Sequence, residues 1–206
     1  MNRCIIFGGG DKVSSDVVEK ELAGGELFIA ADSGYLLMEE LGISPDLVIG
    51  DFDSSPEPEL SCKLVFPVDK DDTDLMLAVK EGLSRGCSRF VIFGATGGRL
   101  DHTIAAVQSL AYILDHGASG VIVSDNERIE LFDPGHYRLF GCSGFTVSFF
   151  AYSEKVTGLD LLGVKYSCKG IELSSGFPLG VSNYIVDEYA DVSFEKGRLL
   201  SVCSRL

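Results

Sequence analysis

The apolar pattern of the chain changes near residue 124, and this change limits which folds are possible. Before that point, short apolar runs alternate with segments whose apolar residues recur every three or four positions. This alternation predicts a parallel sheet with crossover helices. After it, apolar residues recur at every second position between turn residues, with no helix-length stripe. The pattern therefore predicts an antiparallel β-sandwich in the second part of the chain.

We accordingly expect two closely joined domains, an open parallel-sheet (Rossmann-like) α/β domain over residues 1–124 and a β-sandwich domain over residues 125–206. The strands expected in the first domain cover residues 3–7, 27–30, 47–49, 63–66, 89–93 and 120–123. Those expected in the second cover residues 128–132, 137–140, 145–150, 156–161, 192–195 and 199–203. Among the helices, the one after the fifth strand is expected to pack through a stripe formed by Leu100, Ile104, Val107, Ala111 and Leu114.

Three acidic segments each follow a predicted strand of the first domain. They are Gly50–Ser54, Asp69–Asp74 and Gly94–His102. Carboxylates crowded in this way raise each other's pKa unless a cation neutralises them, and hard oxygen ligands suit Mg²⁺. The third segment adds glycine amides and Arg99 for phosphate oxygens. Because ligands of open α/β sheets bind outside the carboxyl ends of the strands, the three segments together predict phosphoryl or pyrophosphoryl transfer.

Each segment alone also has a purely structural explanation. The first is compatible with a turn that carries an Asx cap, the second with a solvated helix start capped by Thr73, and the third with a tight connection. Three such features at successive strand ends are harder to explain in that way. A further glycine run, Gly8–Gly10, either cradles phosphate or only forms a loop, and the sequence leaves both interpretations open.

Composition narrows the possible partners. The formal net charge of −14 disfavours nucleic acid, whose phosphates are bound mainly by Lys and Arg, and favours metal ions and cationic small molecules. The six cysteines show no metal-binding spacing, so reduced thiols are expected. No apolar run approaches the length of a membrane span, and the first residues do not form a signal peptide. We expect a cytoplasmic protein without a membrane or nucleic-acid partner.

The chain resembles the thiamine pyrophosphokinase (thiamin diphosphokinase) family. The resemblance rests on Ala30–Gly34, Pro45–Ser54, Asp69–Asp74, Gly94–His102 and the pair Ser182-Asn183, which occur in the order and spacing of that family. It covers essentially the whole chain. It implies transfer of pyrophosphate from ATP to the hydroxyethyl group of thiamine, with Mg²⁺, giving thiamine diphosphate and AMP. It also implies a homodimer with thiamine bound between the subunits.

The resemblance assigns roles to individual residues. Asp51, Asp53 and Asp74 would bind the metal, and either Asp74 or Asp101 would be the catalytic base. The residues implied for the nucleotide are Asp32, Ser33, Gly34, Thr73, Thr96, Gly97, Gly98, Arg99 and His102. For His102, a role as a helix-cap residue is equally compatible with the sequence. For thiamine they are Ser182, Asn183 and Tyr184. Ser33 stands where the family commonly has glycine, and since the chain has no tryptophan, Tyr184 is the candidate to stack on the aminopyrimidine.

Two other functions remain open at this point. One is a different Mg²⁺-dependent phosphotransferase or hydrolase that acts on a nucleotide. The other is a nucleotide-binding regulatory protein, although a pure binder gains little from so many crowded carboxylates. Production of AMP from ATP, Mg²⁺ and thiamine would separate the three.

Overall fold

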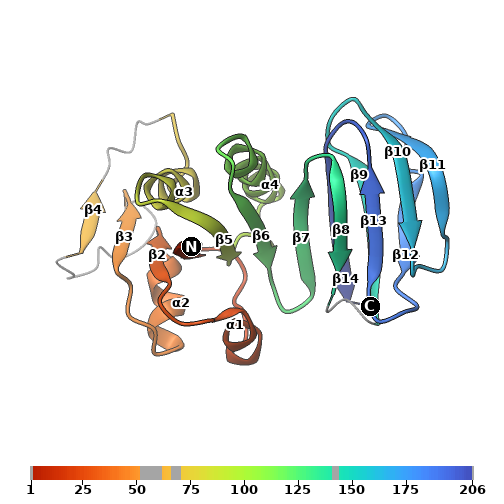
Figure 1. The fold of residues 1–206 in the computed structure, drawn as a ribbon. Coiled ribbons are helices and arrows are strands. Elements are labelled where there is room, and N and C mark those ends of the chain that lie inside the picture. Colours follow the sequence, from red (N-terminus) through yellow and green to blue (C-terminus); the bar gives the residue numbers. More distant parts are fainter. Residues whose placement is uncertain (1, 52–61, 66–70, 141–143, 206) are drawn as a thin grey trace. The chain divides into compact units, whose positions relative to one another are not determined.

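The structure, a computed structural model, describes residues 2–51, 62–65, 71–140 and 144–205 (Figure 1). It divides into two compact units, Met1–Asp125 and Asn126–Leu206. The first is α/β and the second is built from antiparallel strands, so the predicted fold class is confirmed. Within the described ranges, no helix is long and apolar enough to cross a membrane.

The first unit is a parallel sheet with helices on both faces. Its elements are β1 (Asn2–Phe7), α1 (Ser15–Glu21), β2 (Leu27–Ala31), α2 (Gly34–Glu40), β3 (Leu47–Gly50), β4 (Lys63–Val65), α3 (Asp74–Ser84), β5 (Cys87–Phe93), α4 (Leu100–Asp115) and β6 (Ser119–Val123). The strands lie in the order β6-β5-β1-β2-β3-β4, and each neighbouring pair is parallel. Figure 1 shows α1 and α2 on one face and α3 and α4 on the other. The chain reverses its lateral direction between β1 and β5, which makes this pair the topological switch point.

The sheet is buried on both faces, as expected for parallel strands covered by helices. Four consecutive residues of β1, Cys4–Phe7, are completely buried, and Ile29 and Ala30 of β2 and the β5 residues Phe90–Phe93 beside them are buried as well. Helix α3 packs through the small residues Ala78 and Gly82 together with Val79. A Cβ on Gly82 would lie 2.6 Å from the Phe90 ring, so glycine allows this close approach of helix and sheet.

The predicted inner stripe of α4 is wrong in part. Leu100 and Ile104 are 72% and 52% exposed. Ala111 is buried as predicted, and Ala106, Leu110 and Ile113 form the rest of the apolar buried face. The stripe is thus rotated by about one residue from the prediction. Apolar residues occupy most positions of this helix, so their spacing alone does not select which face meets the sheet.

The second unit contains two antiparallel sheets. Its strands are β7 (Glu127–Phe132), β8 (Gly135–Leu139), β9 (Phe145–Ala151), β10 (Lys155–Leu162), β11 (Cys168–Ser174), β12 (Gly180–Tyr184), β13 (Ala190–Phe194) and β14 (Leu199–Arg205). Within this unit the sheet orders are β12-β9-β14-β7 and β11-β10-β13-β8. Alternate residues of the two sheets form the core, including Val147, Phe149, Leu159 and Val192. Strands β11 and β12 were not predicted, because each buries only one side chain fully, Leu173 in β11 and the polar Asn183 in β12.

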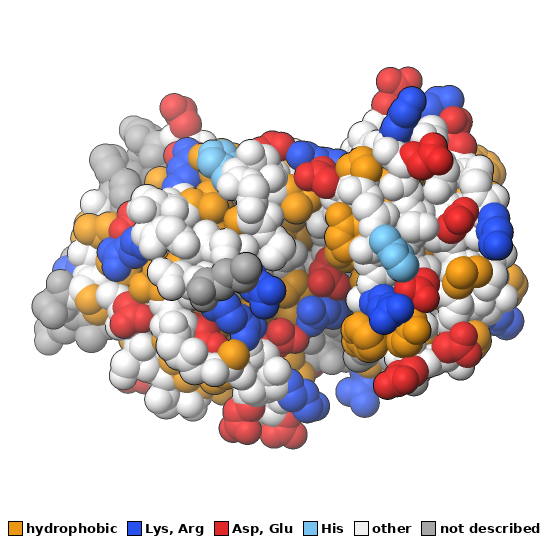
Figure 2. Space-filling model, viewed as in Figure 1, with side chains coloured by type: hydrophobic (Ala, Val, Ile, Leu, Met, Phe, Trp, Pro, Cys, Tyr) orange, Lys and Arg blue, Asp and Glu red, His pale blue; other side chains and the backbone are white. Residues whose placement is uncertain are grey.

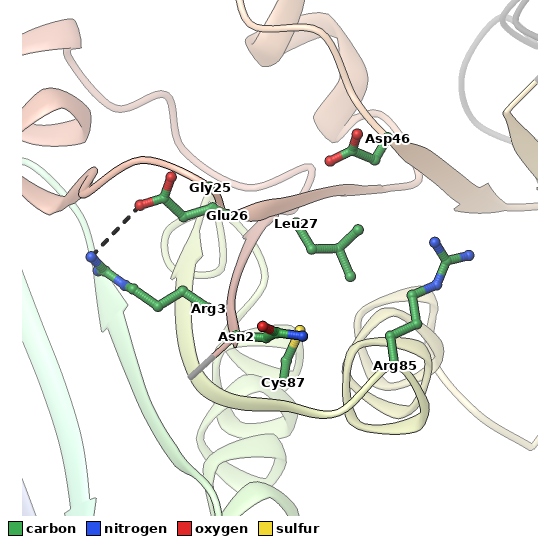
Figure 3. Close-up of a pocket in the computed structure, with 8 residues that line it drawn as sticks. All are labelled: Asn2, Arg3, Gly25, Glu26, Leu27, Asp46, Arg85 and Cys87. Atoms are coloured by element: carbon green, nitrogen blue, oxygen red, sulfur yellow. Dashed lines mark ion pairs between the residues drawn. The ribbon is translucent and has the colours of Figure 1, made fainter.

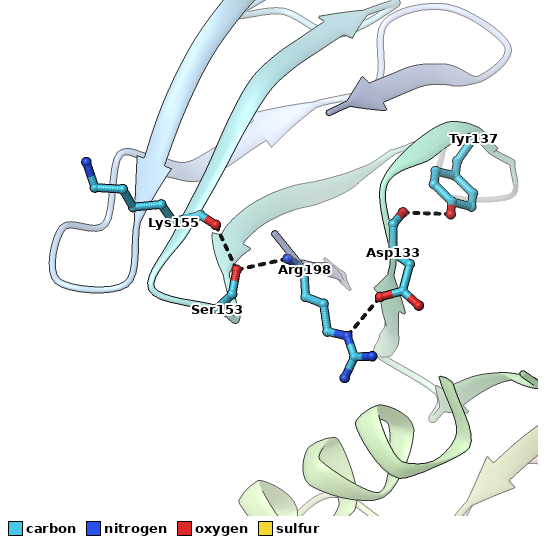
Figure 4. Close-up of polar contacts among 5 residues, drawn as sticks. All are labelled: Asp133, Tyr137, Ser153, Lys155 and Arg198. Atoms are coloured by element: carbon cyan, nitrogen blue, oxygen red, sulfur yellow. Dashed lines mark hydrogen bonds and ion pairs between the residues drawn. The ribbon is translucent and has the colours of Figure 1, made fainter. Parts of the chain in front are cut away.

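A set of polar contacts joins three turns of the second unit (Figure 4). The Arg198 Nε donates to Asp133 Oδ1 at 2.8 Å, and the Tyr137 hydroxyl donates to the Asp133 carbonyl at 2.7 Å. The Arg198 N–H donates to the Ser153 hydroxyl at 2.9 Å, which in turn donates to the Lys155 carbonyl at 2.7 Å. Burial, reinforced by Asp133, raises the pKa of Tyr137, so this hydroxyl stays protonated and remains a donor.

Candidate functional site

The loops that follow β1 and β5 are locked together at the switch point. The Gly8 N–H donates to the Phe93 carbonyl at 2.8 Å, and the Gly10 N–H donates to the Gly94 carbonyl at 2.7 Å. A Cβ on Gly8 or Gly10 would lie 2.6 Å from the Gly94 oxygen, so the glycines are required by this close approach. Two of the three N–H groups in the Gly8–Gly10 run therefore already donate to carbonyls at the end of β5. This weighs against the interpretation of the run as a phosphate cradle.

Asp32 and Ser33 lie between β2 and α2, beside the joined loops after β1 and β5, and Gly34 begins α2. Asp32 has a positive φ of 48°, and its N–H donates to the Ile49 carbonyl at 2.7 Å. Gly34 packs directly on the Phe7 carbonyl, where there is no room for a Cβ. The Ser33 hydroxyl occupies the space above the Gly9 Cα. The structure thus brings these three residues to the carboxyl end of β1, at the edge where ligands of such sheets bind.

The acidic residues after β3 and β4 stand at the same edge. Asp51 directly follows β3 and is partly buried, and Asp74 is the first residue of α3. Asp53 and Asp69 lie outside the described residues. Thr73 caps α3 by accepting the Met76 N–H at 3.2 Å, which confirms the predicted cap.

The aspartates of the second acidic segment are not equivalent. Asp72 is paired with the Lys80 ammonium at 2.6 Å, and this ammonium also lies 5.8 Å from the centre of the Tyr112 ring. The hydrogen bond to Asp72 raises the pKa of Lys80, so the charge of Asp72 is compensated within the protein. Asp74, at the amino end of α3, instead lies where the helix dipole stabilises a negative charge.

The glycine-rich segment after β5 adopts a conformation that requires glycine. Gly97 and Gly98 have positive φ angles of 81° and 59°. Thr96 is buried, and its carbonyl accepts the Asp11 N–H at 2.9 Å. A Cβ on Gly97 would overlap the Asp11 carboxylate, which lies against the Gly97 Cα. The exposed backbone at positions 97 and 98 therefore directly follows Thr96, which is buried and held by a hydrogen bond.

Arg99 and Asp101 form an exposed ion pair at the start of α4. The guanidinium contacts the carboxylate through two hydrogen bonds, Nη2 to Oδ2 at 2.6 Å and Nε to Oδ1 at 3.1 Å. The His102 N–H also donates to Asp101 Oδ1 at 3.1 Å, while the His102 side chain is exposed. The hydrogen bond from Arg99 lowers the pKa of Asp101, so this carboxylate is ionised near neutral pH.

The oxygen donors at this edge suit a hard cation. Among the described residues, no three His, Cys, Asp or Glu side chains converge to hold a metal by themselves. Asp51 and Asp74 nevertheless provide two carboxylates at one edge of the sheet, and Mg²⁺ is commonly bound through one or two carboxylates together with substrate phosphates and waters. The donor set therefore fits Mg²⁺.

Ser182, Asn183 and Tyr184 lie in β12 of the second unit. Ser182 is exposed with a positive φ of 61°, and its N–H donates to the Ser148 hydroxyl at 3.1 Å. Asn183 is only 6% exposed. Its Oδ1 accepts the N–H groups of Tyr166 and Tyr184 at 2.9 Å each, and its Nδ2 donates to the Tyr166 carbonyl at 3.0 Å. Sequence reasoning did not identify Tyr166, because nothing in a single sequence links residues 17 positions apart.

A hollow of about 430 Å³ is found elsewhere in the first unit (Figure 3). Asn2, Leu27 and Cys87, which line it, begin β1, β2 and β5. It therefore lies at the amino ends of the strands, away from the acidic segments. Burial raises the pKa of the Cys87 thiol, so the thiol is protonated and unreactive. Because the hollow lies away from the acidic segments and its thiol is unreactive, we place the candidate site at the carboxyl edge of the sheet.

Charges of both signs cover the face of the molecule that Figure 2 shows. Figure 2 shows Lys and Arg side chains interspersed with Asp and Glu over the visible face, although acidic residues outnumber basic ones by 31 to 17. Many surface carboxylates thus have a neighbouring cation, as Asp72 and Asp101 do. The acidic excess still attracts cationic ligands over longer distances.

Comparisons with known proteins agree with this geometry. Residues 18–122 match the family described as "Thiamin pyrophosphokinase, catalytic domain", and residues 139–199 match "Thiamin pyrophosphokinase, vitamin B1 binding domain". The thiamine pyrophosphokinase of Bacillus subtilis (strain 168) is 31% identical over 186 residues, which cover 86% of this chain and 87% of that protein.

Solved structures support the same assignment. The crystal structure of thiamine pyrophosphokinase from Bacillus subtilis superposes with a TM-score of 0.90 at 27% identity and covers 100% of both chains. That of thiamin pyrophosphokinase from Geobacillus thermodenitrificans gives a TM-score of 0.86 at 28% identity, covering 100% of this chain and 98% of the other. The chain therefore belongs to the thiamin pyrophosphokinase family.

Proposed function

We propose that the protein transfers the pyrophosphoryl group of ATP to the hydroxyethyl oxygen of thiamine. The hydroxyl oxygen bonds to the β-phosphorus, the bond from that phosphorus to the oxygen bridging to the α-phosphate breaks, and AMP leaves with this oxygen. The observation that carries the proposal is the convergence of Asp51, Asp74 and the Gly97–Asp101 segment at the carboxyl edge of one sheet. Membership of the family supports it.

ATP is bound by the loops of the first unit. Arg99 and the backbone amides of Gly97 and Gly98 hold triphosphate oxygens, since a guanidinium and exposed amides are strong donors to phosphate. The remaining contacts with the nucleotide come from residues around this edge, namely Asp32, Ser33, Gly34, Thr73, Thr96 and His102. Asp51, Asp53 and Asp74 hold Mg²⁺, which when bound neutralises phosphate charge.

The Arg99–Asp101 pair couples ATP binding to proton transfer. While Arg99 is bound to Asp101, the lowered pKa makes this carboxylate a poor proton acceptor. A triphosphate competes for the guanidinium. When Arg99 turns to a phosphate, the pKa of Asp101 rises towards its usual value, and Asp101 becomes a better base for the thiamine hydroxyl. Asp74 is the alternative base, and its proposed role as a metal ligand makes it the weaker candidate.

Thiamine is recognised by the second unit through Ser182, Asn183 and Tyr184. The thiazolium ring carries a permanent positive charge, which suits a chain with a net charge of −14. We further propose that the protein is a cytoplasmic homodimer in which thiamine lies between subunits. Each subunit would then supply the ATP loops of one site and the β12 residues of the other.

The decisive experiment incubates the pure protein with ATP, Mg²⁺ and thiamine and measures AMP and thiamine diphosphate by chromatography. Equal formation of both products, dependent on Mg²⁺, is expected. ATP consumption only with a different alcohol, or with water, would instead indicate another Mg²⁺-dependent transferase or a hydrolase. Tight nucleotide binding without turnover would indicate a regulatory protein.

A further inference from the structure

Two tyrosines on the surface of the second unit share a lysine from the same chain. The Lys165 ammonium lies 5.3 Å from the centre of the Tyr166 ring and 5.5 Å from that of Tyr184. Both distances fall within the range of cation–π attraction. Tyr166 is 60% exposed and Lys165 is also exposed, so the cluster faces solvent. This pair of rings thus already holds a positive charge.

The backbone under the two rings is fixed by buried polar contacts. The Asn183 carboxamide bonds both the N–H and the carbonyl of Tyr166, and it also accepts the N–H of Tyr184. The Lys165 N–H donates to the Tyr184 carbonyl at 2.8 Å, and Val164 forms an antiparallel bridge with Ile185. Asn183 is therefore a positioning residue that sets the backbone from which the Tyr166 ring projects.

The lysine side chain, in contrast, is held weakly. An exposed cation–π contact contributes about 0.5–1 kcal/mol, and fixing a lysine side chain costs up to about 2 kcal/mol of rotamer entropy. Two such contacts and this entropy cost nearly cancel. The rings are consequently a preformed site for a cation, and the resident ammonium leaves it at little cost.

We propose that Lys165 is a specificity-determining residue whose ammonium occupies the Tyr166–Tyr184 pair until an aromatic organic cation displaces it. This inference rests on the proposed function, in which the thiazolium of thiamine is that cation. Two cations cannot share the same ring faces without repulsion, so Lys165 lowers the affinity for cationic ligands. An uncharged ring that stacks on Tyr184 must displace the ammonium as well, but it meets no charge repulsion from the displaced lysine.

Calorimetric titration of the full-length protein tests this inference. Lys165→Met should lower the Kd for thiamine roughly two- to fivefold: about twofold because the ammonium occupies the rings for about half of the time, and the rest because its repulsion of the cation is lost. The Kd for 4-amino-5-hydroxymethyl-2-methylpyrimidine, an uncharged probe, should fall by no more than about twofold, because only the displacement of the ammonium is relieved. Lys165→Arg retains a cation over the rings and should behave as wild type. Lys169→Met, at an exposed position in β11, removes the same charge and is the matched control.

Unchanged or weaker thiamine binding in Lys165→Met would overturn the inference. An equal gain in Lys169→Met would do the same, because it would reduce the effect to net charge.

A second readout separates this inference from the proposed function. In the free protein, NMR signals of the Lys165 ε-protons should be shifted upfield by the rings, and Tyr166→Leu or Tyr184→Leu should remove part of this shift. Saturating thiamine or N-methylthiazolium should abolish it. Displacement without AMP formation would refute the proposed function and support the inference. AMP formation while the Lys165 signals stay upfield at saturating thiamine would refute the inference alone.

Discussion

At the scale of single residues, neighbouring aspartates differ in what their charge can do. Asp72 is paired with Lys80, and Asp51 follows β3 at the ligand-binding edge. We expect Asp51→Asn to lower turnover roughly 100-fold or more, about 2.7 kcal/mol, because a hard anionic ligand is lost. Asp72→Asn is the matched control and should stay within about threefold of wild type. Steady-state AMP formation across a Mg²⁺ titration measures both, and equal losses would remove Asp51 from the metal site.

Arg99 and Asp101 allow a test by pH. Because the Arg99 hydrogen bond lowers the pKa of Asp101 in the folded protein, the pair stabilises the fold at neutral pH and loses this effect as the pH falls through the lowered pKa. Both side chains are mostly exposed, so titration is a better readout than stability. In Arg99→Met, ¹³C NMR should show the pKa of Asp101 rising towards its ordinary value. In Arg85→Met, which removes a guanidinium paired with Glu81, the pKa of Asp101 should stay low.

Arg99→Lys provides a kinetic test of the same residue. A point charge cannot reproduce a two-pronged phosphate contact, so turnover should fall tenfold or more, a loss of roughly 1–3 kcal/mol. Wild-type turnover in this variant would mean that Arg99 serves only as the partner of Asp101.

At the scale of elements, the packing of α2 on the β1 loop depends on two glycines that tolerate change differently. A Cβ on Gly9 would meet only the Ser33 hydroxyl and would lie 3.5 Å from the Ser33 Cβ, whereas a Cβ on Gly34 would strike the Phe7 carbonyl. A hydroxyl can rotate away but a strand carbonyl cannot. We expect Gly9→Ala to cost about 1 kcal/mol of unfolding free energy and Gly34→Ala about 3 kcal/mol or more.

Denaturant unfolding of double variants checks the cause. Ser33→Ala removes the hydroxyl that opposes Gly9, so Gly9→Ala/Ser33→Ala should regain most of the loss. The same Ser33→Ala change should not rescue Gly34→Ala. Additive losses in the first pair would show that the serine hydroxyl is not the obstacle.

The sequence predicted those helices and strands in which buried apolar residues are consecutive or recur at regular positions. Each strand of the parallel sheet was predicted, since each contains consecutive apolar residues, and so was the Thr73 cap. Helix α1, with Val18 as its only fully buried residue, and the largely exposed β12 carry no such pattern and were missed. The sequence also could not predict that Asn183 fixes the backbone of Tyr166. The two residues are brought together by the antiparallel bridge between Val164 and Ile185.

At the scale of the whole molecule, the proposed homodimer makes a quantitative prediction. If each thiamine site combines the first unit of one subunit with β12 of the other, Asp74→Asn and Asn183→Ala should each be inactive alone. A hybrid dimer would then hold one intact site and one doubly altered site. Random mixing makes about half of the dimers hybrid, so the mixture should recover about a quarter of wild-type activity under two-fold symmetry.

Two controls make this result interpretable. Circular dichroism and thermal melting must show that Asn183→Ala remains folded, because its carboxamide holds the backbone of Tyr166 in place. Mass spectrometry of the mixed proteins must show hybrid dimers. If hybrids form and no activity returns, Asp74 and Asn183 act within the same subunit. A single chain would then supply both the ATP loops and the thiamine contacts, and the dimer would have no part in assembling the site.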